Sequence, residues 1–258
     1  MEDINAESTV PVSAWLRLRA SAVHLYTASG AVLTLLILVA AYNGDAVAAL
    51  WLVLATLVID STDGLLARRF RVKELLPGFD GSLLDNIVDY MTYVLAPILL
   101  LWTAGYLPDG PFGVALAALP ILASSYQFCR VDAKTGDGAE TEHFFLGFPS
   151  YWNIAAFYVI VFDLDAAAVG AMLLVCSLLV FVPIRYIYPS RTVAFRKLTL
   201  TLTTLWLLSY IGILVQMPNP DPVLQALSLL YLAYYFGASF YISWKMLRES
   251  RTAREYTH

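Results

Sequence analysis

Long apolar stretches separated by short polar turns run through the whole chain. A membrane-spanning helix needs roughly 20 mostly apolar residues, because the hydrocarbon core is about 30 Å thick and each residue rises about 1.5 Å. Eight stretches meet or approach this length, near residues 24–43, 46–67, 82–104, 111–130, 150–162, 166–187, 198–217 and 223–245. The fifth is short, and its bounds are the least defined. The pattern predicts an all-α polytopic membrane protein with about eight transmembrane helices.

The composition supports this interpretation. The 258 residues are 59% hydrophobic and 14% charged, whereas a soluble domain is about half apolar and a quarter charged. Cys129 and Cys176 are far apart and have neither a metal-ligand nor a CxxC spacing, so we expect two small apolar side chains. The net charge of −4 is small, and no nucleic-acid partner is expected.

The basic residues predict the orientation in the membrane. If the N-terminus is cytoplasmic and the chain crosses eight times, all 16 Lys and Arg residues fall on the cytoplasmic side. The opposite loops then hold only acidic charges, at Asp45, Asp109, Asp163, Asp165 and Asp221. Because cytoplasmic loops are enriched in Lys and Arg, both termini are expected in the cytoplasm.

Three parts of the chain are expected. They are a polar N-terminal tail over 1–14, a membrane domain over 15–245 and a basic cytoplasmic tail over 246–258. The acidic and polar character of 1–14 predicts no cleavable signal peptide. Residues 15–19, Trp-Leu-Arg-Leu-Arg, predict either an interfacial amphipathic helix before the first span or an ordinary positive flank of that span.

Four aspartates lie within or at the edge of apolar helical patterns, at the expected cytoplasmic ends of the second and third spans: Asp60, Asp63, Asp85 and Asp89. An ionised carboxylate inside a membrane helix costs about 2.5–3.5 kcal/mol on insertion scales. No basic residue lies four positions away to offset this cost. Hard divalent cations such as Mg²⁺, Mn²⁺ or Ca²⁺ would offset it, because they prefer carboxylate oxygens.

The spacing of these residues predicts two helical stripes. One holds Asp60, Asp63 and Ala67, and the other holds Gly81, Asp85 and Asp89. Two stripes that face each other would gather four carboxylates around one or two metal ions. Gly64 and Gly81 would leave room for another molecule, and the fork-shaped guanidinium of Arg68 would suit a phosphate.

From the residues alone, three interpretations stay open. They are metal-assisted phosphoryl chemistry, ion- or proton-coupled transport, and structural charge at the membrane interface. A transporter is expected to expose charge along a path from both sides of the membrane. The acidic cluster belongs to the cytoplasmic half and the outer halves of the spans are apolar, which favours the enzyme.

Read as D-x2-D-G-x2-A-R-x12-G-x3-D-x3-D, the segment over 60–89 resembles the signature of the CDP-alcohol phosphatidyltransferases. The matching positions are Asp60, Asp63, Gly64, Ala67, Arg68, Gly81, Asp85 and Asp89. The 12-residue gap after Arg68 is long for this family. Further segments, at 24–30, 83–97, 127–135 and 143–153, resemble a bacterial branch whose acceptor is choline. The resemblance covers roughly residues 20–250.

The resemblance implies transfer of a phosphatidyl group from CDP-diacylglycerol to choline, with serine, inositol or glycerol phosphate as alternative acceptors. Asp60, Asp63, Asp85 and Asp89 would bind Mn²⁺ or Mg²⁺, and Asp89 would also be the general base. CDP-diacylglycerol would contact Asp60, Asp63, Gly64, Ala67, Arg68 and Gly81. It also implies a multi-pass protein of the bacterial inner membrane with a cytoplasmic active site and, by analogy, a homodimer.

Choline carries a quaternary ammonium that has no hydrogen-bond donor, so aromatic faces must recognise it. Each such contact contributes about 0.5–2 kcal/mol. The candidate choline-binding residues are Tyr151, Trp152, Tyr126, Tyr186 and Glu142. Tyr151 and Trp152 are preferred among them, because they open the fifth expected span beside a polar loop.

Overall fold

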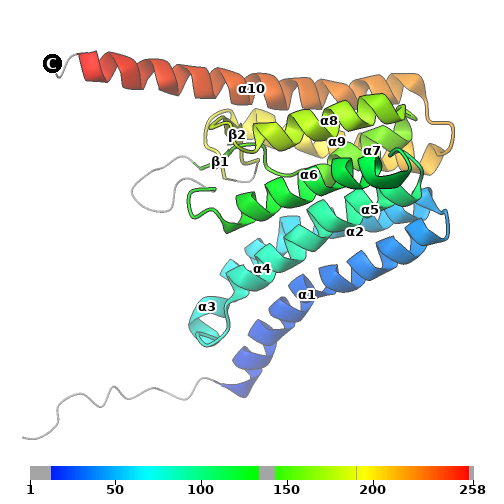
Figure 1. Cartoon of the computed structure of the whole chain (residues 1–258). Coiled ribbons are helices and arrows are strands. Elements are labelled where there is room, and N and C mark those ends of the chain that lie inside the picture. Colours follow the sequence, from blue (N-terminus) through cyan, green and yellow to red (C-terminus); the bar gives the residue numbers. More distant parts are fainter. Residues whose placement is uncertain (1–12, 134–142, 190, 256–258) are drawn as a thin grey trace, which may run out of the picture.

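The computed structural model describes residues 13–133, 143–189 and 191–255 and shows a bundle of roughly aligned helices (Figure 1). The chain begins with α1 (Ala14–Tyr42), α2 (Ala46–Arg69) and the short α3 (Val72–Leu75). A continuous helical rod follows, made of α4 (Gly81–Asp89), the π-helical segment η1 (Tyr90–Leu95) and α5 (Ala96–Thr103). The remaining elements are α6 (Gly110–Cys129), β1 (Phe144–Leu146), α7 (Trp152–Val161), α8 (Ala166–Leu179), β2 (Arg185–Ile187), α9 (Arg196–Gln216) and α10 (Pro222–Glu255).

Six helical stretches in the described part of the chain are long and apolar enough to cross a membrane. They are α1, α2, the rod over Gly81–Thr103, α6, α9 and α10. The protein is therefore a multi-pass, predominantly helical membrane protein, as the sequence predicts. The expected count of eight spans is not confirmed, because the fifth and sixth stretches form shorter helices of 10 and 14 residues.

The apolar character of α7 has a different origin from that of the long helices. Eight of its residues, among them Trp152, Asn153 and Phe157, are buried inside the protein. A helix that is apolar on all sides is suited to a protein core as well as to lipid. At about 1.5 Å per residue, α7 is only about 15 Å long, roughly half the hydrocarbon thickness.

The sixth expected span, near 166–187, ends early in the structure. The α-helix stops at Leu179, and the chain turns at Pro183 into strand β2. Proline has no amide hydrogen and disfavours helical geometry at the residue before it. Strand β2 pairs antiparallel with β1, Phe145 opposite Tyr186, so the structure adds a short β-ribbon to the expected all-α fold.

Both ends of the chain are more helical than expected. Residues 15–19 form the first turns of the long α1 rather than a separate interfacial helix. At the other end, α10 continues as far as Glu255, through most of the expected tail over 246–258, and extends beyond the bundle (Figure 1, red).

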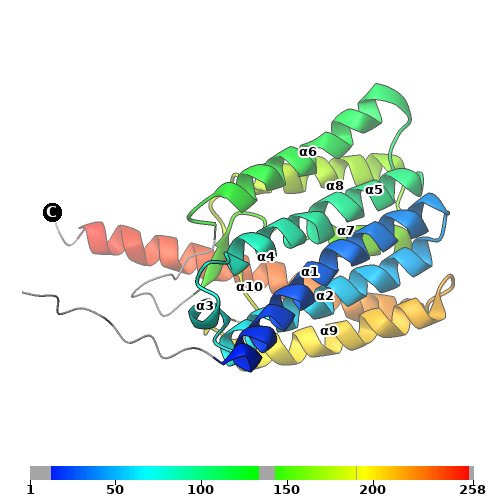
Figure 2. The ribbon, with the colours of Figure 1, turned by 90° about the horizontal axis from the view of Figure 1, so that it is seen from below.

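The two ends of the bundle differ in charge. The turns after α1, α5, α7 and α9 lie together at one end (Figures 1 and 2). The opposite end carries α3, the β-ribbon, the start of α1 and the end of α10. Every described Lys or Arg lies in one of these elements, in the loop between β2 and α9, or at the adjoining ends of α2, α6 and α9. This second end is called the basic end below.

The rod formed by α4, η1 and α5 packs against α1 and widens at its centre. There, the amide of Ala96 bonds to the carbonyl of Met91, five residues back, as in a π-helix. Pro97 supplies a physical reason, because in a regular α-helix its ring would crowd the carbonyl of Tyr93 four residues earlier. The wide turn follows Asp89 directly, and π-segments often lie at functional sites.

Candidate active site

Two neighbouring helices bring three of the four predicted aspartates together. Carboxylate oxygens of Asp60 on α2 and of Asp85 and Asp89 on α4 lie within 4.8 Å of one another. Each of these three side chains is partly accessible. Three oxygen ligands at this separation fit a hard divalent cation such as Mg²⁺ or Mn²⁺, which also keeps water among its ligands. The geometry therefore offers a metal site near the basic end of the bundle.

Asp63, the fourth predicted aspartate, lies beside this group in a more enclosed position. Its side chain is 5% exposed and accepts a hydrogen bond of 2.9 Å from the hydroxyl of Thr27 on α1. It is close enough to Asp60 and Asp85 to interact with both carboxylates. A second hydrogen bond between α1 and α2 joins the hydroxyls of Tyr26 and Thr62 at 2.8 Å. Helix α1 therefore orients the face of α2 that carries the carboxylates.

Tyr93 on the π-segment holds Asp60 from the other side. Its hydroxyl donates to Oδ2 of Asp60 over 2.5 Å, and the tyrosine side chain is buried. A donor of this kind fixes which lone pairs of the carboxylate remain for a metal ion. The π-turn sets the direction of Tyr93, so the local widening of the helix contributes to the geometry of the site.

The two motif glycines allow close approach of side chains from the protein itself. A Cβ at Gly81 would lie 2.7 Å from Cε1 of His24 on α1, and one at Gly64 would lie 3.3 Å from a guanidinium nitrogen of Arg68. His24 also stacks near Phe79, with ring centroids 4.3 Å apart. Ala67 is half-buried and Arg68 is exposed at the end of α2. The small residues therefore let His24 and Arg68 close around the edge of the carboxylate group.

Asp80 fixes the start of the helix that carries Asp85 and Asp89. Its carboxylate accepts from the Ser82 amide at 3.1 Å, the Ser82 hydroxyl at 2.7 Å and the Leu83 amide at 3.0 Å. These bonds, above all the one from the Ser82 hydroxyl, hold the pKa of the Asp80 carboxyl below its ordinary value. The ionised carboxylate is thus an N-cap of α4.

Replacing Asp80 with alanine is expected to lower any activity that depends on the carboxylate group about three- to tenfold, because the first turn of α4 loses its cap. Asp80→Asn retains a good cap and should stay near the wild-type value. The lowered pKa also predicts a pH effect. The ionised cap stabilises the folded state above the ordinary Asp pKa of about 3.9, and this contribution is lost as the pH falls through the lower folded-state pKa.

Thermal unfolding of the wild type and Asp80→Asn between pH 3 and 7 measures this effect, because asparagine does not titrate. The wild-type melting temperature should fall relative to that of the variant at the acidic end. Parallel curves would show that Asp80 does not cap α4.

Two of the aromatic residues predicted to bind choline lie in the core. Trp152 is 0% exposed, and its indole nitrogen donates to the hydroxyl of Ser124 at 2.8 Å. Tyr186 is also 0% exposed, in the β-ribbon, where it packs against Phe148 and Tyr235. Neither is brought to the carboxylate group.

The remaining predicted choline-binding residues, apart from Tyr151, are Tyr126 and Glu142. Tyr126 is 49% exposed, with the guanidinium of Arg130 over its ring at 5.7 Å. Glu142 lies outside the described residues.

Tyr151 is the predicted choline-binding residue that the structure places beside the aspartates. Its ring centroid is 6.0 Å from that of Tyr93, the residue that bonds to Asp60. The rings of Phe145 and Tyr235 lie at 6.2 and 6.1 Å from it. Tyr188 stacks on Phe145 at 4.4 Å. These five rings, of Tyr93, Phe145, Tyr151, Tyr188 and Tyr235, form what we call the aromatic cluster.

The supporting residues of the site were not predicted from the sequence. Thr27, Tyr93 and His24 contact motif residues that are far away along the chain; Thr27 and Asp63, for example, are 36 positions apart. Two signals were available: a polar side chain within an apolar helix, as Thr27 and His24 are in α1, and the position of all three residues in the segments 24–30 and 83–97 that carry the resemblance. Neither signal names a partner.

Known proteins share both the motif and the larger part of this chain. The family model described as CDP-alcohol phosphatidyltransferase matches residues 22–135. The phosphatidylcholine synthase of Legionella bozemanae is 42% identical over 211 residues, 79% of this chain and 94% of that protein. The chain belongs to the CDP-alcohol phosphatidyltransferase family. Phosphatidylcholine synthase of Pseudomonas aeruginosa is 37% identical over 232 residues, 90% of this chain and 93% of that protein.

The region that matches the CDP-alcohol phosphatidyltransferase model contains only part of the site. Residues 22–135 hold all four aspartates, Thr27 and Tyr93. Phe145, Tyr151, Tyr188 and Tyr235 of the aromatic cluster lie beyond it, in the part of the chain that has its likeness in the phosphatidylcholine synthases. The carboxylate group therefore lies within the region that matches the family model, whereas most of the aromatic cluster lies outside that region.

Proposed function

We propose that the protein transfers the phosphatidyl group of CDP-diacylglycerol to choline, which produces phosphatidylcholine and CMP. The observation that carries this proposal is the convergence of Asp60, Asp85 and Asp89 within 4.8 Å, inside the region that matches the CDP-alcohol phosphatidyltransferase model. Relatives named phosphatidylcholine synthase, similar over most of their length, favour choline among the acceptors.

The reaction requires a nucleophile, a base and compensation of negative charge. A divalent cation held by Asp60, Asp85 and Asp89 supplies Lewis acidity for the pyrophosphate. Asp89 takes the proton of the choline hydroxyl as its oxygen attacks the phosphatidyl phosphorus. The bond from that phosphorus to the oxygen of CMP breaks, and CMP leaves with the electron pair. Asp63 completes the negative group from its enclosed position against Thr27.

The edges of the site position the nucleotide lipid. Arg68, exposed at the end of α2, presents a guanidinium that can bond to two phosphate oxygens at once. Gly64, Ala67 and Gly81 keep the backbone surface shallow around it, with His24 closing over Gly81. Tyr93 keeps Asp60 in one orientation throughout. We therefore assign the phosphate to Arg68, one helical turn beyond Gly64 on α2.

The aromatic cluster is the proposed choline site. A quaternary ammonium is attracted to aromatic faces, at about 0.5–2 kcal/mol per contact. Tyr151 lies within electrostatic reach of Asp60 and in ring contact with Tyr93, so an ammonium held there is near the carboxylates. The hydroxyl end of choline, two carbons from the nitrogen, then faces Asp89. Trp152 and Tyr186 support this cluster from the core rather than touching the substrate.

Replacing Tyr151 tests the choline site. Tyr151→Leu is expected to raise KM for choline about tenfold while KM for CDP-diacylglycerol changes less than twofold, because one cation–π contact is lost. Tyr151→Phe keeps the aromatic face and should stay near wild type. Steady-state kinetics with both substrates varied provide the measurement. An equal loss in the Leu and Phe variants would instead assign the hydroxyl, and not the ring, to the reaction.

An acceptor panel tests the function itself. Purified protein with CDP-diacylglycerol and Mg²⁺ or Mn²⁺ is given choline, serine, inositol or glycerol phosphate, and CMP release is measured. Choline should give at least about tenfold more CMP than any other acceptor, because the aromatic cluster matches only a quaternary ammonium. Preference for another alcohol would reassign the acceptor. Failure of all four would remove the transferase proposal and leave ion- or proton-coupled transport.

The orientation and assembly are part of the same proposal. We place the basic end, and with it the active site and both termini, at the cytoplasmic face of the bacterial inner membrane, because cytoplasmic loops are rich in Lys and Arg. There the nucleotide lipid arrives from the bilayer and choline from the cytoplasm. The three-part division of the chain at residues 14 and 245, and a homodimer, remain predictions from the sequence and from family analogy.

A further inference from the structure

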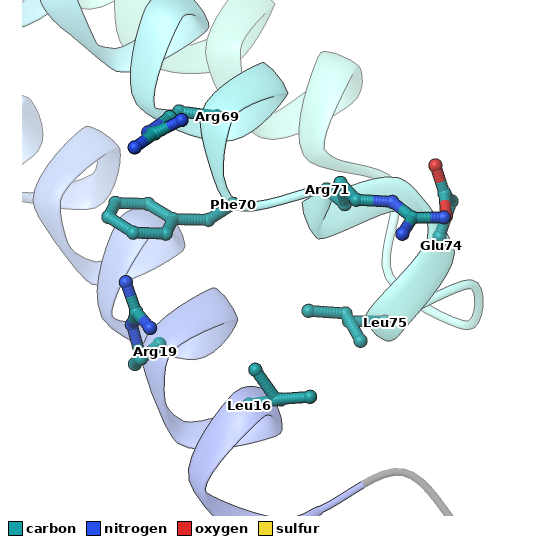
Figure 3. A pocket seen from close by; sticks show the side chains of 7 residues that line it. All are labelled: Leu16, Arg19, Arg69, Phe70, Arg71, Glu74 and Leu75. Atoms are coloured by element: carbon teal, nitrogen blue, oxygen red, sulfur yellow. The ribbon is translucent and has the colours of Figure 1, made fainter. Parts of the chain in front are cut away.

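A cavity of about 410 Å³ opens at the basic end, where the first turns of α1 meet the corner between α2 and α3. Its lining residues are Leu16, Arg19, Arg69, Phe70, Arg71, Glu74 and Leu75 (Figure 3). None of them belongs to the carboxylate group, the motif or the aromatic cluster. The cavity is therefore separate from the site described above.

The charges in this cavity are unbalanced. Arg71 forms an ion pair with Glu74. Among the residues that the structure describes, Arg19 and Arg69 have no carboxylate partner. They extend on either side of the Phe70 ring (Figure 3), and the guanidinium of Arg19 lies 4.6 Å from the centre of that ring. Two guanidinium groups that line one cavity favour an anion, and they suit a phosphate in particular.

The remaining lining is apolar and continues onto an exposed apolar face. Leu16, Phe70 and Leu75 line the cavity, above a small core that includes Val72 and is separate from the main core. Leu16 itself is 40% exposed, and Trp15, which precedes it on α1, is 61% exposed. Indole, leucine and arginine side chains together are typical of the membrane interface, where acyl chains cover the apolar groups.

We propose that this cavity binds an anionic phospholipid of the surrounding leaflet, with its phosphate at Arg19 and Arg69 and its acyl chains along Leu16 and the exposed face of α1. A lipid can contact both the arginines and the apolar residues of the cavity, whereas free phosphate can contact only the arginines. The size is suitable, because ligand sites commonly have volumes of about 300–1,000 Å³. The bound lipid would join α1 to the α2–α3 corner, next to the motif residue Arg68.

The proposal is tested by the binding of phosphatidylglycerol to the detergent-purified full chain, measured by native mass spectrometry. The double variant Arg19→Gln/Arg69→Gln should bind at least about tenfold more weakly, since two charge-assisted contacts are lost. The matched control is Arg17→Gln/Lys73→Gln, which removes two cations from α1 and α3 that do not line the cavity. This control should bind like the wild type. Zwitterionic phosphatidylcholine should bind more weakly than phosphatidylglycerol to wild type.

Several outcomes would overturn the proposal. Equal binding by the double variant and the wild type would show that the lipid binds elsewhere, and equal losses in both double variants would indicate bulk charge only. Displacement of the lipid by millimolar inorganic phosphate would identify free phosphate as the ligand. Binding that appears only after deletion of residues 1–12, which include Glu2, Asp3 and Glu7, would assign the cavity to the chain's own N-terminal segment. Far-UV circular dichroism and choline-transfer assays on the same samples confirm folding and separate this result from failure of the transferase proposal.

Discussion

Asp89→Asn is expected to lower the rate of phosphatidyl transfer by about 10²–10⁴-fold, because an amide cannot accept the choline proton. The substitution keeps the size and shape of the side chain, so the fold should be retained. Asp89 lies within 4.8 Å of Asp60 and Asp85, which is why the proposed mechanism assigns the role of base to it. Single-turnover CMP release from pre-bound CDP-diacylglycerol measures the chemical step directly.

The control for this variant is Asp109→Asn. Asp109 is exposed at the opposite end of the bundle, before α6, and the same chemical change there should leave transfer unchanged. Retention of full activity by Asp89→Asn would remove Asp89 from the role of base. A fall in both variants would point to a general effect on stability instead.

Chelation of divalent ions is expected to abolish transfer and to lower the thermal stability of the protein. Three carboxylates within 4.8 Å repel each other when no cation is bound. A ligand that binds only the folded state stabilises it by RT ln(1 + [L]/Kd), about 2.7 kcal/mol at 100 times Kd. Mg²⁺ or Mn²⁺ added back to the EDTA-treated protein should therefore restore CMP release and raise the melting temperature.

The variant Asp85→Asn separates this effect from unspecific ion binding. It removes one proposed ligand and should lose most of the rise in melting temperature, whereas Asp109→Asn should keep it. Comparison of Mg²⁺ with Mn²⁺ in the same titration identifies the preferred ion. Full activity in EDTA, with no response of the melting temperature to either ion, would contradict the metal site. The stability measurement needs no substrate, so it is independent of the choice of acceptor.

Some tertiary features of the site serve positioning rather than chemistry. Thr27, Tyr93 and Asp80 do not belong to the motif, yet they bond to Asp63, to Asp60 and to the start of α4. Mutation of groups that orient metal ligands typically lowers metal affinity or activity by about 10–100-fold. Their placement explains how carboxylates on separate helices keep a common geometry inside a membrane protein.

Three features could be predicted from the order of residues: the membrane class, the segregation of charge and the pairing of aspartates on two helices. Each of these depends on local order along the chain. Apolar run length distinguishes membrane helices, positive residues recur after alternate runs, and spacings of three and four place Asp60 with Asp63 and Asp85 with Asp89 on common helical faces. The four aspartates could be named for this reason.

Two other features depend on how the helices pack: which apolar stretches lie in the protein core, and which partners the motif residues have. The apolar composition of α7 suits both a lipid environment and a protein interior. Its burial in the protein depends on the helices that pack around it. Likewise, Tyr93 reaches Asp60 across 33 positions, and Tyr151 meets Tyr93 although Trp152, its neighbour, points into the core. Such contacts depend on helix packing, for which sequence spacing carries no signal.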